Sequence, residues 1–169
     1  PPHINESAEN FSVETKDGGA LAIRFGLGTI KNVGGASIEG LIAVRTESGP
    51  YRDIEDFCKR ANLTGATSRT IEHLAQAGAF EGLGETRNTL FSNSERIMNL
   101  ARRERELRES GQSTMFDLFG SQVDTPMPAL ELGFMADNPD TVLGWEKELL
   151  GVYVSEHPFR AVATAVAQY

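Results

Sequence analysis

The sequence contains a single cysteine, Cys58, and no long apolar run. No disulfide can form within the chain, and such sparse use of cysteine favours a cytoplasmic protein. No stretch is apolar for long enough to cross a bilayer, and no basic or apolar block after Pro1 indicates a signal peptide. An initiator methionine is also absent. We therefore expect an excised fragment of a longer protein that has no contact with a membrane.

Residues suited to catalysis or metal binding are few and scattered. The three histidines, His3, His73 and His157, are far apart in the sequence, which argues against a metal site or a catalytic base. The closest acidic pair, Glu55 and Asp56, fits the first turn of a helix, where the helix dipole favours negative charge. We expect no catalytic residue, no metal site and no cofactor in this chain.

The net charge of -8 is concentrated at the two ends of the sequence. Residues 21–111 together carry a net charge of +1, whereas residues 112–169 carry -6. A nearly neutral central region grips phosphates through a few placed groups, without long-range attraction. We therefore expect weak binding of nucleic acid by this chain alone.

The local patterns predict a mainly α fold that starts with a short β-hairpin. Alternating residues at 11–15 and 20–25 flank Asp17-Gly18, a typical hairpin turn. A pair of helices is predicted over 27–46, a third from the cap Asp53 through Lys59, and a fourth from Thr67 or Ser68 to Gly78.

The second half of the chain is predicted to hold a charged helix, a linker and a last helix. Residues 93–110 carry ion pairs at helical spacing, of which Arg105 and Glu109 are one. Residues 120–140 contain three prolines and little periodicity, which indicates a linker. The last helix is predicted from about Thr141, capped by Asp140, as far as Tyr153. Cys58 is interpreted as a small buried residue rather than a reactive thiol.

A glycine-rich turn at residues 25–36 is the first candidate binding site. It separates two helical patterns and leaves backbone N–H groups unpaired at the start of the second helix, where they can hold a phosphate. Gly34 and Gly35 are expected to supply positive φ or a close approach of another backbone, and Lys31 a mobile positive charge. An ordinary glycine-closed turn is the alternative.

A second turn of the same kind lies at Gly82-Leu83-Gly84, again between two helices. Two such turns about fifty residues apart favour paired phosphate-binding hairpins over unrelated loops. A further short motif, Gln112-Ser113-Thr114-Met115-Phe116, places two large apolar side chains in a predicted loop. These side chains either fill a pocket of a partner or cover the core of this protein.

The chain resembles the C family of bacterial replicative DNA polymerases, the polymerase III alpha subunits. Five blocks carry the resemblance in the order of the family and span nearly the whole chain, at residues 1–7, 23–34, 56–58, 74–80 and 146–153. Asn32 departs from the family, which has glycine before the apolar residue of the first hairpin. Asparagine tolerates the left-handed conformation, so we expect the turn to be kept.

The resemblance implies a division of the chain into five regions. Residues 1–25 correspond to the end of the fingers region with the β-hairpin, and residues 26–111 to a tandem helix-hairpin-helix domain that grips duplex DNA. Residues 112–119 correspond to a peptide that binds the sliding clamp (the beta subunit), and residues 120–140 to a linker. Residues 141–169 correspond to a helix leading toward an OB-fold domain.

The resemblance also implies the site residues and partners. The DNA-binding set is Lys31, Asn32, Val33, Gly34, Gly35, Ser37, Gly82, Leu83, Gly84, Thr86 and Arg87, and the clamp-binding set is Gln112, Met115 and Phe116. The parent polymerase would use Mg²⁺ held by aspartates that precede Pro1, so catalysis lies outside this chain. Other replisome subunits are implied as further partners. A helical protein-interaction scaffold that binds no DNA is the alternative function.

Overall fold

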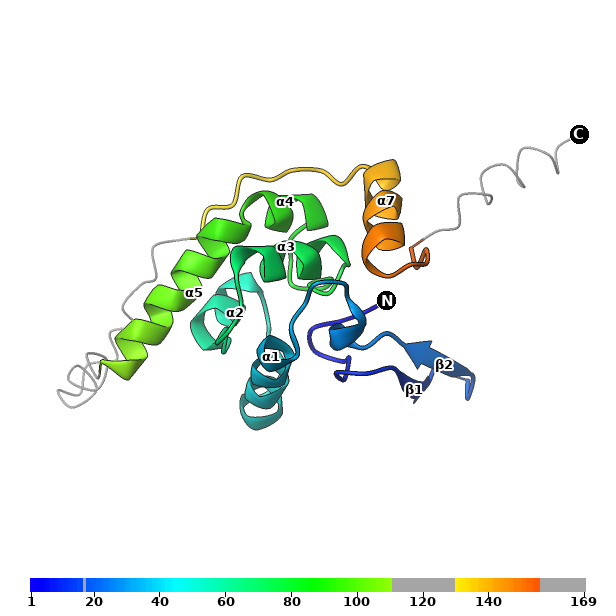
Figure 1. The fold of residues 1–169 in the computed structure, drawn as a ribbon, viewed down its shortest axis with the longest axis horizontal. Coiled ribbons are helices and arrows are strands. Elements are labelled where there is room, and N and C mark those ends of the chain that lie inside the picture. Colours follow the sequence, from blue (N-terminus) through cyan, green and yellow to red (C-terminus); the bar gives the residue numbers. More distant parts are fainter. Residues whose placement is uncertain (17, 111–129, 156–169) are drawn as a thin grey trace, which may run out of the picture.

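The computed structural model describes residues 1–16, 18–110 and 130–155. Its first element is the expected β-hairpin, in which β1 (Ser12–Thr15) pairs antiparallel with β2 (Leu21–Arg24). Gly18 and Gly19 have φ of 90° and 81°, the left-handed region that a tight hairpin turn requires. The hairpin extends away from the helices that make up the rest of the protein (Figure 1).

The remaining elements are helical, which confirms the predicted mainly α fold. In order they are η1 (Leu27–Thr29), α1 (Gly35–Ser48), α2 (Ile54–Arg60), α3 (Ser68–Gln76), α4 (Arg87–Ser92), α5 (Ser94–Glu109) and α7 (Pro139–Leu149). The prediction of a helical pair over 27–46 is corrected at its start. The first member is only a three-residue 3-10 turn, because the chain becomes extended again at the cap Ile30.

The starts of α2 and α3 show the predicted capping chemistry. Asp53 accepts a hydrogen bond from the Asp56 N–H at 2.7 Å and begins α2. Thr67 begins α3 with a reciprocal pair of hydrogen bonds to Thr70. Gly78, at φ 80°, follows the end of α3 as expected.

One hydrophobic core joins the helices to the N-terminal segment. Phe57 lies between Tyr51 and Phe80, with ring centroids 5.1 and 5.0 Å away in edge-to-face geometry. Ile4 is fully buried, and its N–H donates to the Ala79 carbonyl at 2.7 Å. Cys58 is also fully buried, which confirms its interpretation as a core residue, and burial raises the pKa of its thiol to about 12.

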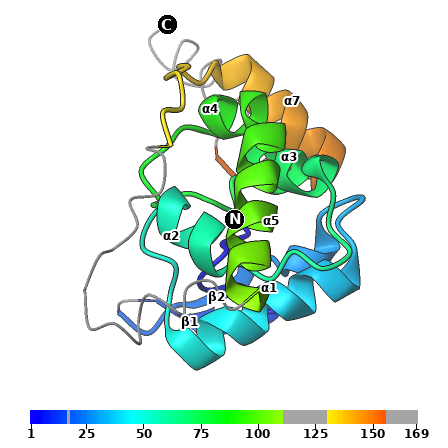
Figure 2. The ribbon, with the colours of Figure 1, turned by 90° about the vertical axis from the view of Figure 1, so that its left-hand side faces the viewer.

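The long charged helix α5 packs against α2 and α3 along one face of the molecule (Figure 2). Its apolar side chains Ile97, Met98 and Ala101 are buried in the common core. Its outer face is polar, and the predicted pair Arg105–Glu109 is present, with Nε 2.6 Å from Oε1. This is an exposed ion pair, which contributes little to stability.

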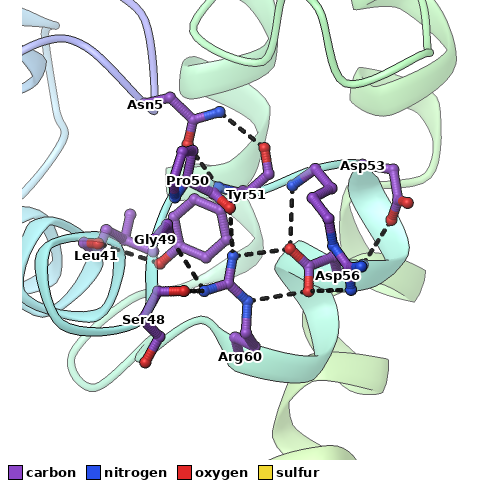
Figure 3. Close-up of polar contacts among 10 residues, drawn as sticks. Asn5, Leu41, Ser48, Gly49, Pro50, Tyr51, Asp53, Asp56 and Arg60 are labelled. Carbon is purple, nitrogen blue, oxygen red and sulfur yellow. Dashed lines mark hydrogen bonds and ion pairs between the residues drawn. The ribbon is translucent and has the colours of Figure 1, made fainter.

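Asp56 is the centre of a polar cluster that joins α2 to the end of α1 (Figure 3). Arg60 donates to both carboxylate oxygens of Asp56, at 2.9 and 2.7 Å. The same guanidinium donates to the carbonyls of Ser48, Gly49 and Pro50. Burial opposes the ionised carboxylate, but the hydrogen bonds from Arg60 and Arg52 outweigh it and lower the pKa of Asp56. Asp56 therefore has a structural role at the helix start.

The last helix differs from its prediction at both ends. Asn138 caps α7 by accepting hydrogen bonds from the Asp140 and Thr141 N–H groups, and Pro139 takes the first helical position. The helix ends at Leu149, so Tyr153 lies beyond it. Asparagine before proline is a stronger start signal than Asp140, since proline is pre-organised for the first turn.

The segment 130–138 was expected to belong to a linker, but it is packed against the helices. It runs from the side of α5 across α4 to the start of α7 (Figure 1). The Arg96 guanidinium donates to the Glu131 carbonyl at 2.6 Å, and the Met135 carbonyl accepts from the Thr86 hydroxyl at 2.5 Å. The other linker residues, 120–129, lie outside the described part of the chain, as do Gln112, Met115 and Phe116. None of the helices described here is long and apolar enough to span a bilayer.

Candidate nucleic-acid interface

The first hairpin turns at Asn32. This residue has φ 63°, so it adopts the left-handed conformation that we expected asparagine to tolerate. Val33 is 7% exposed and anchors the turn in the core, and its N–H donates to the Ile30 carbonyl at 3.2 Å. The expected positive φ at Gly34 is wrong, because Gly34 is extended at φ -76° and Gly35 starts the helix.

The close approaches in this motif are made by the two earlier glycines. A Cβ atom at Gly26 would lie 2.3 Å from the Glu9 carbonyl oxygen, and one at Gly28 would lie 2.9 Å from it. Gly28 also donates its N–H to that carbonyl at 2.9 Å. These glycines therefore admit the N-terminal segment of this protein, whereas a Cβ at Gly34 would meet only open space.

The start of α1 has the features of an anion site. Its cap is Gly34, which offers no side chain to satisfy the first N–H groups. Within the described residues, no hydrogen-bond acceptor lies in range of the N–H groups of Gly34, Gly35 and Ala36, and all three residues are exposed. Three outward backbone donors at a helix N-terminus favour negative charge. Ser37 is different, because it is 1% exposed and donates its N–H to the Gly34 carbonyl.

Two charged side chains flank this helix start. The exposed Lys31 lies one residue before the Asn32 turn, and its backbone N–H donates to the Leu149 carbonyl of α7 at 3.1 Å. Glu9 is also exposed, and its Oε1 lies 3.4 Å from the position that a Cβ of Gly35 would take. Lys31 adds to the attraction for a phosphate, and Glu9 opposes it.

The second hairpin has the expected shape. Gly82 and Gly84 are both left-handed, at φ 86° and 95°. Leu83 lies between them, 3% exposed, and donates its N–H to the Phe80 carbonyl at 3.1 Å. Like Val33 in the first hairpin, Leu83 fixes the turn to the core.

The start of α4, which follows this hairpin, is already satisfied inside the protein. The two carboxylate oxygens of Asp137 accept from the N–H groups of Arg87 and Asn88, at 3.3 and 2.8 Å. The Thr86 hydroxyl accepts from the Thr89 N–H at 3.1 Å. We expected these backbone groups to meet phosphate oxygens, but an internal carboxylate holds them instead.

Arg87 is likewise engaged within the fold. Its Nη1 lies 2.9 Å from the Oε1 of Glu146, a carboxylate with no exposed surface. Its guanidinium also donates to the Gln76 carbonyl and to the Ser155 hydroxyl. The Nη1 and Nη2 groups of Arg87 are thus bound within the protein, and its side chain is only 13% exposed. Thr86 is also bound internally, to Thr89 and Met135, so the proposed DNA interface contains neither residue.

Sequence reasoning missed Asp137 and Glu146, the two carboxylates that hold the second hairpin. Asp137 is fifty residues from Arg87, and Glu146 is 59 residues from it. Nothing in the local pattern connects these positions, because the contacts arise only when the C-terminal segment folds back over α4. The one available signal was the helical spacing that places Glu146 on the same face as the apolar Val142 and Leu149.

The titratable side chains of the described residues form no cluster around the first hairpin. No cluster of three or more metal-ligating side chains occurs in the described part of the chain. Burial and the neighbouring Arg69 lower the pKa of His73, which disfavours its charged form. What the first hairpin offers is three free backbone donors with a lysine beside them.

Comparisons with known proteins agree with this geometry. A family model described as a helix-hairpin-helix motif matches residues 1–90, which include both hairpins. The DNA polymerase III subunit alpha of Campylobacter jejuni is 39% identical over 94% of this chain and 13% of its own length. That of Mycobacterium tuberculosis is 33% identical over 99% of this chain and 14% of its own length.

The subunit alpha of Haemophilus influenzae is 34% identical over the whole of this chain and 14% of its own length. The chain thus spans only about a seventh of the length of the curated relatives that it matches. The free helix start, the two glycine hairpins and these similarities lead to one assignment. The chain belongs to the helix-hairpin-helix motif family, and it corresponds to a segment of the DNA polymerase III alpha subunits.

Proposed function

We propose that this chain binds the backbone of duplex DNA through its first hairpin, independently of sequence. The observation that carries the proposal is the exposed row of unpaired N–H groups at Gly34, Gly35 and Ala36, with Lys31 beside it. Backbone donors read the regular path of phosphates and carry no base code. The second hairpin then serves to support the domain, because the donors at the start of α4 are satisfied by Asp137.

The similarity to a segment of polymerase subunits suggests a role for this DNA binding. In a protein about seven times longer than this chain, a domain that holds duplex DNA keeps the product close to the enzyme. Nucleotide addition, Mg²⁺ binding and contacts with other replisome subunits would belong to the longer protein, which we expect to work in the cytoplasm. Within that protein, the first hairpin of this chain would position the duplex.

Binding to labelled duplex DNA at low salt tests the proposal. A site that neutralises one or two phosphates predicts a log–log salt slope of about -1 to -2. Lys31→Glu should weaken binding to every duplex alike. Lys59→Glu is the matched control, since Lys59 is also an exposed lysine but belongs to α2 and to neither hairpin. Equal effects of the two substitutions, or no binding by the wild-type chain, would contradict the proposal and favour a protein-interaction scaffold.

We also propose that Gln112, Met115 and Phe116 dock on the sliding clamp. Burying two large apolar side chains contributes about 1.5–3 kcal/mol each, before the cost of ordering the segment. A peptide of residues 110–120 should bind the clamp, and replacing Gln112 and Phe116 with alanine should abolish binding. A wild-type peptide that fails to bind would show that this motif does not act as a clamp ligand.

A further inference from the structure

Helix α7 makes polar contacts with both hairpins, although it is far from them in sequence. At its C-terminal end, the Leu149 carbonyl accepts from the Lys31 N–H of the first hairpin at 3.1 Å. One turn earlier, Glu146 binds Arg87 at the start of α4, which follows the second hairpin. In Figure 1, α7 lies beside the α3–α4 region and the chain that leads into α1. Helix α7 therefore connects the first hairpin to the start of α4 through polar contacts, in addition to the core that both parts share.

Glu146 fixes this connection in place. Its side chain is fully buried and accepts from the Arg87 Nη1 at 2.9 Å, the Val154 N–H at 2.8 Å and the Ser155 N–H at 3.0 Å. The Ser155 hydroxyl donates to it as well. Of these donors, Arg87 connects α7 to the start of α4, whereas Val154 and Ser155 hold the segment that follows α7 against the helix. The charge-assisted contact with Arg87 therefore sets the position of α7 relative to α4. The position of the Leu149 carbonyl follows from the position of Glu146, because three residues of rigid helix join them.

The contact with Lys31 lies next to the residue that reverses the chain direction in the first hairpin. Lys31 directly precedes Asn32, the left-handed residue that reverses the chain before α1. The hydrogen bond from the Lys31 N–H to Leu149 holds the residue before the reversal in place. The burial of Val33 in the core holds the residue after it. With both residues held, the orientation of the N–H groups of Gly34, Gly35 and Ala36 is set as well.

We propose that Glu146 is a positioning residue for DNA binding: through α7 and the Leu149 carbonyl it sets the direction of the first hairpin's free N–H groups. The inference rests on the proposed function, because it assumes that these groups meet phosphate. Glu146 itself touches no DNA. Its effect passes through Leu149 to Lys31.

The central test compares two isosteric substitutions in the 169-residue chain. Glu146→Gln removes the charge that Arg87 requires. Asp56→Asn does the same to the other buried ion pair, which joins α2 to the C-terminal end of α1 (Figure 3). Both variants should lose stability. Only Glu146→Gln should weaken duplex DNA binding, by about fivefold or more, the lower end of the usual coupling between two separate sites.

Hydrogen exchange at the Lys31 amide provides the readout that a general loss of stability would not give. Exchange should be faster in Glu146→Gln than in Asp56→Asn when both are compared at equal global stability. Ser155→Ala removes one donor to Glu146 from an exposed position and is the milder variant, which should show both effects more weakly.

The outcomes separate this inference from the proposed function. If the wild-type chain binds no DNA, both are overturned. If it binds DNA and Glu146→Gln binds equally well, only the positioning role is overturned. Equal weakening by Glu146→Gln and Asp56→Asn would overturn it too, because the effect would then follow stability alone.

Discussion

Gly78→Ala should be unusually destabilising, because both the left-handed backbone at this position and the neighbouring Arg87 side chain require the absence of a Cβ atom. The φ of Gly78 is 80°, and a Cβ atom there would lie 2.6 Å from both Cζ and Nη2 of Arg87. A left-handed alanine costs roughly 1–2 kcal/mol. The displaced guanidinium would also leave the buried Glu146 poorly paired, and removing one partner of such a pair costs about 3–5 kcal/mol.

The guanidinium in Gly78→Ala is shifted rather than removed, so only part of the ion-pair cost applies. We expect a total loss of about 3–5 kcal/mol in the free energy of unfolding, measured by urea titration. Gly65→Ala is the matched control. Gly65 has φ 76° and nothing within 4 Å of its would-be Cβ, so only the backbone cost of about 1–2 kcal/mol should appear.

The difference between the two alanine variants measures the disturbance of Arg87. It should be about 2–3 kcal/mol in the wild-type background and should vanish when Arg87 is itself replaced by alanine. Equal losses in Gly78→Ala and Gly65→Ala would refute the reasoning. That result would mean that the Arg87 side chain moves aside at no cost.

Three further predictions concern charge, pH and thiol reactivity. Glu9→Gln should tighten duplex DNA binding by about two- to fivefold at low salt, since it removes a negative charge next to the start of α1; unchanged affinity would place the DNA elsewhere. The folded-state pKa values of Asp56 and Glu146 are lowered, so both carboxylates add stability above the unfolded pKa of about 4 and lose it as the pH falls. The free energy of unfolding should therefore fall less steeply with decreasing pH in Asp56→Asn than in the wild-type chain. An equal fall in the two proteins would count against the Arg60 contact. Cys58, with its pKa raised to about 12, should react with an aromatic disulfide reagent only on unfolding, and fast labelling of the native chain would show that it is accessible.

The local chemistry of the sequence determined the start and end of most elements. Asp17-Gly18 predicted the hairpin between β1 and β2, and Asp53 and Thr67 predicted the starts of α2 and α3. These signals act over two to four residues, since a cap or a tight turn is satisfied by its immediate neighbours. The left-handed Asn32 followed from the same kind of reasoning.

The candidate site was predicted in part. The unpaired donors at the start of α1 follow from a glycine cap without a side chain, which is a local property. The matching donors at α4 looked equally free in the sequence. They are satisfied by Asp137, which reaches them from fifty residues away.

The sequence by itself thus determined which segments form helices, where the two hairpins lie and which family of polymerase subunits the chain resembles. Only the tertiary structure decided that the two hairpins differ, with one facing outward and the other held by Asp137, and with Arg87 paired to Glu146. The physical reason is the separation along the chain of the groups that pair. Caps and turns are satisfied by neighbours along the chain, whereas a buried carboxylate finds its donors only after distant segments have packed together.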